Sequence, residues 1–258
     1  MSLRRAAARV APVASALLLL IALWDLGVRI FEPEPWLVPP PGDVVDAFWR
    51  TRSVLDDHLR ATMTEAVLGL VIGSLAGAAL AIGLSLSTPV RRAVQPLLIA
   101  TQSVPLVVLA PLLIVWFGFG TGPRVAVVAI IAFFPVAIST LESLLGTDAE
   151  VIELFRGLGA GRRTTLWQAR LPAALPGFFA GMKVSSAYAM FGAVVAEWMG
   201  ASVGLGVYLQ RSQASFRTDQ LFAAVFLIAV ASMALFGLVS LLARVALPWR
   251  HPEPGAPT

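Results

Sequence analysis

Polar side chains inside long apolar stretches are the residues of this chain with the clearest chemical potential. An amide, hydroxyl or carboxylate in such a stretch usually faces other helices or a water-filled path. A phenol ring can stack on an aromatic solute, and an amide can hydrogen-bond to the edge of that solute. We predict that this set includes contacts to a solute path, and for each residue the alternative is a bond to a neighbouring helix. The candidates are Gln102, Ser103, Ser185, Tyr188 and Glu197.

The sequence lacks the residues that most enzyme and metal sites require. It contains no cysteine, which excludes thiolate catalysis and cysteine-based metal sites. His58 and His251 are the two histidines, and since they lie far apart we expect both to be solvated. The single lysine, Lys183, follows Met182, so the Gly-Lys pair of a phosphate-binding loop is missing. We expect neither catalysis nor a cofactor in this chain.

Composition points to an integral membrane protein. The chain has 258 residues, of which 58% are hydrophobic and 13% are charged, whereas a soluble domain carries about a quarter charged residues. Of its 19 basic residues, 18 are arginines placed near the ends of apolar stretches. Membrane topology explains such a distribution better than nucleic-acid binding does.

Hydropathy predicts an all-α polytopic protein with six transmembrane helices. The segment 31–60 should form an outer loop and a short interfacial helix, 88–92 a short basic loop, and 248–258 a disordered tail. Glu65, one turn into the second span, is expected at the membrane interface. The first span resembles a signal peptide but lacks a convincing cleavage site, so we expect it to be retained. The spans are placed at 11–30, 61–87, 94–117, 124–145, 174–199 and 219–247.

The distribution of arginine indicates the orientation. Six spans put both termini on one side of the membrane. If that side is the cytoplasm, eleven arginines lie inside and seven outside, as the positive-inside rule requires. The loop 146–172 is then cytoplasmic.

The second predicted span carries a stripe of small residues. Gly69, Gly73 and Gly77 recur every four residues, which places them on one helix face. Such a face lets another helix approach closely in a membrane. We predict that helix packing occurs there.

The loop from Glu153 to Pro172 is polar and arginine-bearing, and it lies between two apolar spans. Its first part should form a short helix with one apolar stripe, which is too short to cross a membrane. Glycines then interrupt the helix. A second short helix over about 162–171 should carry Trp167 and Leu171 one turn apart. Both helices suit a water-facing surface that binds a partner, although an ordinary amphipathic loop is the alternative.

This loop resembles the EAA loop of bacterial ABC-importer permeases, whose pattern is E-A-A, three residues, G, nine residues, I-x-L-P. Leu154 and Phe155 replace the two alanines, and Ala169 replaces the isoleucine. The residues in register are Glu153, Gly159, Leu171 and Pro172.

Other segments extend the resemblance to the nitrate/sulfonate/taurine group of these permeases. They are LVPPPGDVVDAF, APLLIVWFGFG and VVAEWMGASVGLG, in the same order along the chain. Within the group, ATQSVPLVVLAPLLIVWFGFG and LLARVALPWRH look most like the pyrimidine-precursor permeases of thiamine biosynthesis.

The resemblance implies the permease subunit of an ATP-driven importer in a bacterial inner membrane. Residues 1–60 would hold the first helix, a periplasmic loop and the interfacial helix, and 61–247 the permease core. It also implies a homodimer, a separate ATP-binding subunit that holds ATP and Mg, and a periplasmic or lipid-anchored substrate-binding protein. The residues of the coupling loop would be Glu153, Leu154, Phe155, Gly159, Trp167, Leu171 and Pro172.

The resemblance implies a small organic solute as the substrate, such as a pyrimidine or thiamine precursor, with sulfonate, taurine or nitrate as alternatives. An ATP-independent secondary transporter is the alternative from another class. Such a transporter would need ion-coupling charges near mid-membrane, and the spans offer few.

Overall fold

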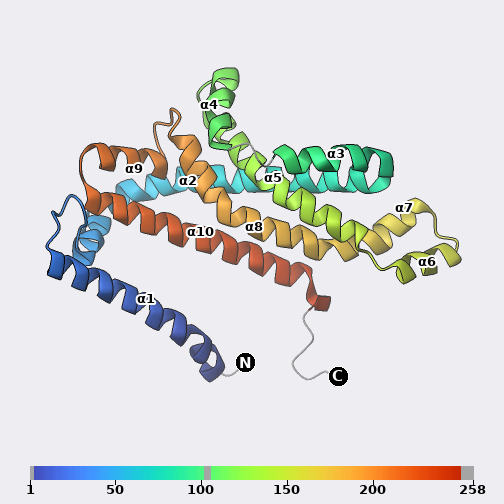
Figure 1. The fold of residues 1–258 in the computed structure, drawn as a ribbon, viewed down its shortest axis with the longest axis horizontal. Helices are drawn as coiled ribbons and strands as arrows, with labels where there is room; N and C mark the ends of the chain where they lie inside the picture. The colour runs from blue at the N-terminus through green and yellow to red at the C-terminus, as the bar shows by residue number, and fades with distance from the viewer. Residues whose placement is uncertain (1–2, 102–105, 251–258) are drawn as a thin grey trace. The chain divides into compact units, whose positions relative to one another are not determined.

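A computed structural model describes residues 3–101 and 106–250, and the regular elements within these ranges are all helical, as predicted (Figure 1). The chain divides into two compact units, described here one at a time: residues 1–57 with 208–227, and residues 58–207 with 228–258. The longer helices are α1 (Leu3–Phe31), α2 (Pro41–Leu86), α5 (Thr121–Leu145), α8 (Leu171–Glu197) and α10 (Thr218–Ala246). The shorter ones are α3 (Thr88–Thr101), α4 (Leu106–Phe117), α6 (Ala149–Gly157), α7 (Arg162–Thr165), the π-helical turn η1 (Leu166–Arg170), α9 (Leu205–Ala214) and the 3-10 turn η2 (Pro248–Arg250).

Aromatic contacts join the helices of the smaller unit. Trp24 of α1 stacks on Phe222 and Phe226 of α10, with ring centroids 5.5 and 5.9 Å apart. The Tyr208 hydroxyl of α9 donates a hydrogen bond of 3.0 Å to the Thr51 hydroxyl of α2. These contacts connect α1, the start of α2, the end of α9 and the start of α10.

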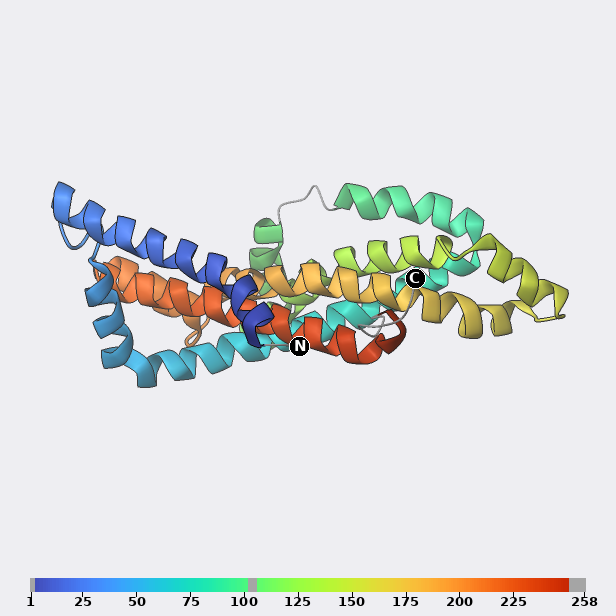
Figure 2. The same ribbon diagram turned by 90° about the horizontal axis from the view of Figure 1, so that it is seen from below.

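Helix α5 is the central element of the larger unit. Figures 1 and 2 show α5 and α8 running side by side, and the α6–α7 segment projects from the end of this pair. Val128, Ala132 and Val136 of α5 are completely buried. The α5–α8 pair therefore carries the segment in which the coupling loop was predicted.

Glycines allow both α2 and α8 to approach α5 closely. A Cβ atom at Gly73 of α2 would overlap the Ala129 carbonyl oxygen and lie 2.9 Å from the Ala132 Cβ atom. A Cβ atom at Gly181 of α8 would lie 2.6 Å from the Pro135 carbonyl oxygen. Gly69 and Gly77 lie on the same α2 face and also meet α5 atoms. The stripe of small residues on α2 thus lies in a helix–helix contact.

Among the described residues, four helical segments are long and apolar enough to cross a membrane. They are Pro41–Leu86, Thr121–Leu145, Arg162–Glu197 and Thr218–Ala246, which include the second, fourth, fifth and sixth predicted spans. The predicted third span instead comprises two helices, α3 and α4, of 14 and 12 residues. Neither helix alone is as long as a bilayer-crossing helix, which needs about 20 residues.

Two local predictions were wrong. The expected interfacial helix is not separate, because α2 runs without interruption from Pro41 to Leu86. No glycine or proline occurs between Gly42 and Gly69, so nothing in the sequence ends a helix near residue 60. The predicted basic loop at 88–92 is the start of α3. Pro89 favours this helix start because its missing N–H is not needed in the first turn.

Replacement of Gly73 by leucine should separate α2 from α5. The new side chain would overlap α5 backbone atoms, and overpacking of this kind costs about 1–3 kcal/mol. Gly83 lies on the same helix, and a Cβ atom there would meet no atom within 4 Å, so Gly83→Leu is the matched control. We expect a lower yield and melting temperature in detergent for Gly73→Leu only. Equal stability of the two variants would show that Gly73 does not lie in a tight contact.

Candidate functional site: the 153–172 loop and the polar groups

The loop begins with a well-capped short helix. The Asp148 carboxylate accepts a hydrogen bond of 3.0 Å from the Glu150 N–H, which caps α6. No residue of α6 is buried. Leu154 is 62% exposed, and Leu158, which follows the helix, is 76% exposed. Two leucines of the apolar stripe are therefore largely exposed, a feature of surfaces that bind other proteins.

Gly159 ends α6 with a left-handed residue. Its φ is +76°, a conformation that glycine adopts without steric cost. The Gly159 N–H donates to the Arg156 carbonyl and the Ala160 N–H donates to the Phe155 carbonyl, both at 2.9 Å. This pair of bonds is the Schellman motif. The motif requires a residue that tolerates positive φ, so the turn depends on glycine at position 159.

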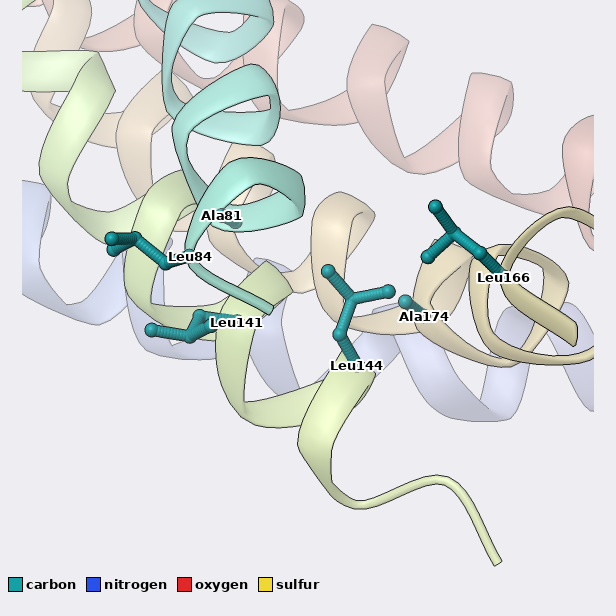
Figure 3. Close-up of a cluster of buried hydrophobic side chains, with 6 residues drawn as sticks. All are labelled: Ala81, Leu84, Leu141, Leu144, Leu166 and Ala174. Carbon is teal, nitrogen blue, oxygen red and sulfur yellow. The ribbon is translucent and has the colours of Figure 1, made fainter. Parts of the chain in front are cut away.

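The second half of the loop is anchored on one side and exposed on the other. Thr165, Leu166 and Ala169 are buried, whereas Trp167 is 63% exposed. Leu166 belongs to a buried cluster with side chains of α2, α5 and α8 (Figure 3). The π-helical turn η1 runs directly into α8, so the predicted second helix is continuous with that span. The cluster comprises Ala81, Leu84, Leu141, Leu144, Leu166 and Ala174.

The seven residues predicted for the coupling loop share one surface segment and form no enclosed pocket. Phe155 and Leu171 are half-buried, and the other five are exposed. Leu171 packs against the buried cluster at the base of the loop. The exposed members are Glu153, Leu154, Gly159, Trp167 and Pro172.

The structure separates the predicted pathway residues. Ser185 is fully buried, and its hydroxyl donates a bond of 2.9 Å to the Ala132 carbonyl of α5. Tyr188 lies three residues further along α8, at the edge of the buried face, and is 56% exposed. Gln102 and Ser103 lie outside the described residues. Ser185 therefore occupies the α5–α8 contact, and Tyr188 is the member of the set on an exposed helix face.

Glu197 lies at the centre of a buried hydrogen-bond network. Its carboxylate accepts bonds of 2.6 Å from the Thr62 hydroxyl of α2 and from the Gly206 N–H. The Thr62 oxygen also accepts a bond of 2.8 Å from the Leu205 N–H. A Cβ atom at Gly204, where φ is +143°, would overlap this carboxylate. The network attaches the turn after α8 to α2, so Glu197 positions this turn.

The expectation of a solvated His58 was wrong. The residue is 6% exposed, and its Nδ1 atom lies 2.6 Å from the Gly204 carbonyl oxygen and 2.9 Å from the Gly204 nitrogen. The other histidine, His251, lies outside the described residues. The glycine-rich segment GASVGLG is the local sequence feature at this contact, and it does not indicate that His58 is the residue that packs against Gly204.

Glu65, which the sequence places one turn into the second span, is buried inside the protein. Glu65 is 2% exposed, and its carboxylate forms an ion pair of 2.6 Å with the Arg124 guanidinium of α5. Arg124 itself is largely buried. Packing of α2 on α5 brings together two charges that lie 59 residues apart. A pair is required because an isolated charge in such a place is costly.

Comparisons with known proteins agree with this architecture. A chain of the MetNI methionine ABC transporter, solved in inward-facing conformations, superposes with a TM-score of 0.68 at 17% identity, covering 76% of this chain and 98% of that one. Because the identity is low, this likeness shows the fold alone.

Sequence relatives show the family. The formylaminopyrimidine transport permease protein ThiX of Halalkalibacterium halodurans is 32% identical over 92% of this chain and 94% of its own length. The riboflavin transport system permease protein RibX of Chloroflexus aurantiacus is 32% identical over 90% of this chain and 88% of its own. The resemblance predicted from the sequence, including its group, is confirmed.

The family model for the inner membrane component of binding-protein-dependent transport systems matches residues 69–250. This match covers the central helices and the whole 153–172 loop. A component of this kind is a permease and not the catalytic subunit, and it implies a separate ATP-binding subunit. The chain belongs to the binding-protein-dependent transport system inner membrane component family, as a multi-pass permease of an ABC importer.

Proposed function

We propose that the 153–172 loop is the surface on which the ATP-binding subunit docks. The observation that carries the proposal is an exposed apolar stripe beside a glycine turn, on a segment whose base is packed into the core. Leu154 and Leu158 offer apolar area to a partner, while Leu166 transmits displacement of the loop to α2, α5 and α8 because all four pack together. Movement of the ATP-binding subunits would thereby displace the transmembrane helices α2, α5 and α8.

The working unit in this proposal is a homodimer with the solute path between two copies. The exposed face of α8 that carries Tyr188 is available to a second copy. A binding protein would deliver the solute to the outer face. ATP in the partner subunits would favour one access state, because a ligand shifts such an equilibrium only through different affinities for the two states.

Six spans with cytoplasmic termini complete the proposed topology. The six spans would be the four apolar helical segments, the 29-residue helix α1, and the α3–α4 pair, which would together form one broken span. The arginine distribution supports this orientation. Broken spans are tolerated where protein or a water-filled cavity satisfies the backbone.

The proposed substrate is a small nitrogen heteroaromatic solute such as a pyrimidine. The names of the two relatives refer to formylaminopyrimidine and riboflavin, and both molecules contain such a ring. The exposed Tyr188 ring could stack on it. Sulfonate, taurine and nitrate are the alternatives. Uptake into proteoliposomes that hold permease, ATP-binding subunit and binding protein distinguishes them, because only the true substrate accumulates with ATP.

Gly159→Val should abolish docking of the ATP-binding subunit without loss of membrane insertion. Valine at a φ of +76° costs about 1–2 kcal/mol and opens the Schellman turn that orients α6. Gly157 also lies in the loop, but its φ is not positive and it has open space around it, so Gly157→Val is the matched control. Affinity pull-down of the ATP-binding subunit and ATP-dependent uptake should fall only for Gly159→Val. Undiminished binding by Gly159→Val would remove the docking assignment.

Single cysteines should distinguish the exposed position 188 from the buried position 185 of α8. The native chain has no cysteine, so each introduced thiol reports one position. We expect Tyr188→Cys to react with a small water-soluble thiol reagent, at a rate that changes when ATP is trapped in the partner. Ser185→Cys should stay inert because its site is buried against α5. An inert Tyr188→Cys in every state would exclude Tyr188 from the path.

A further inference from the structure

A hollow of about 500 Å³ lies beside the 153–172 loop in the larger unit. One wall is the junction of α2 and α3, and the other is the segment from α6 to η1. We name it the arginine hollow, because its lining includes Arg156, Arg162 and Arg170. The opposite wall includes Ser85, Ser87 and Thr88, of which the Ser85 hydroxyl donates a bond of 2.7 Å to the Ile82 carbonyl.

The positive charge of the arginine hollow is not neutralised from within. Among the described residues, no carboxylate belongs to its lining. None of the three arginines forms an ion pair with any residue in the described ranges 3–101 and 106–250. Three guanidinium groups around one hollow repel each other, and an anion would relieve this repulsion.

Arg170 gives an independent indication of a missing acceptor. Its Nε atom is buried and has no hydrogen-bond partner among the described residues. A buried donor on a charged group is costly to leave unpaired. Because this atom is itself inaccessible, an anion in the hollow would contact other atoms of the Arg170 side chain, which is the least exposed of the three arginines.

The opposite wall also favours negative charge. Helix α3 has 14 residues and begins at Thr88, and the Ser87 carbonyl accepts the Arg91 N–H at 2.9 Å. The N–H groups of the first turn have no acceptor within the helix, and the helix dipole is positive at this end. Guanidinium groups, hydroxyls and a helix start are the donors that bind phosphate-type oxyanions in proteins.

We propose that the arginine hollow binds a phosphate-type oxyanion, supplied either by a lipid headgroup or by a free anion. Arginine suits this ligand because its planar donors match the oxygen spacing of phosphate. The ligand is distinct from the transported solute, because the hollow lies beside the 153–172 loop and none of the described pathway residues, Ser185, Tyr188 and Glu197, lines it.

The test compares the full-length permease in nanodiscs with an Arg156→Gln/Arg162→Gln variant. Both side chains are exposed, so the exchange should leave the fold intact. Arg163→Gln is the matched control, because Arg163 is an exposed neighbour that does not line the hollow. One arm titrates inorganic phosphate into neutral-lipid nanodiscs, with thermal stabilisation as the readout. The other arm measures retained phosphatidylglycerol by native mass spectrometry.

In one of the two arms, the double variant should bind phosphate or phosphatidylglycerol at least about tenfold more weakly than the wild type. A charge-assisted hydrogen bond accounts for about that factor. The Arg163→Gln variant should bind as the wild type does. Loss in the phosphate arm identifies a free anion, and loss only in the phosphatidylglycerol arm identifies a lipid headgroup. Unchanged binding in both arms overturns the proposal. Loss of the ATP-binding subunit with both arms unchanged also overturns it, since the arginines would then contact carboxylates of that partner.

Discussion

Close backbone contact between helices is the constraint on which the larger unit depends. In a bilayer the lipid tails are as apolar as leucine, so helices associate through tight packing and hydrogen bonds. Glycines of α2 and α8 let both helices approach α5, at Gly73 and Gly181 among other positions. The Ser185 hydroxyl adds a hydrogen bond to the α5 backbone in the same contact. The position of every functional group discussed for this unit follows from this three-helix arrangement.

This arrangement explains how one loop can be both exposed and firmly attached. Leu166 packs with α2, α5 and α8 at the base of the loop (Figure 3), while Leu154 and Trp167 remain exposed. A surface that must receive force from a partner needs both properties. An unattached loop would absorb the motion, and a buried loop could not meet the partner.

Buried polar groups at the other end of the α2–α5–α8 contact attach its elements to one another. Glu197 accepts bonds from Thr62 and from the backbone of the glycine-rich turn, and Glu65 pairs with Arg124. A charge removed from water persists in a fold only when it is paired or hydrogen-bonded. This requirement makes the turn after α8 a defined structure in spite of its three small residues between Met199 and Val203.

Local features of the chain were determined by the sequence alone: the apolar helices, the i, i+4 glycine face of α2, the end of α6 at Gly159 and the family resemblance. Each depends on residues within a few positions of one another. The tertiary structure alone decided which distant groups meet. Thr62 bonds Glu197 across 135 positions and His58 bonds Gly204 across 146, and no local pattern encodes such pairs. The convergence of three arginines on one hollow also arises only when α2, α3 and the 153–172 loop fold against each other, because the direction of each side chain is set by packing and not by its neighbours in sequence.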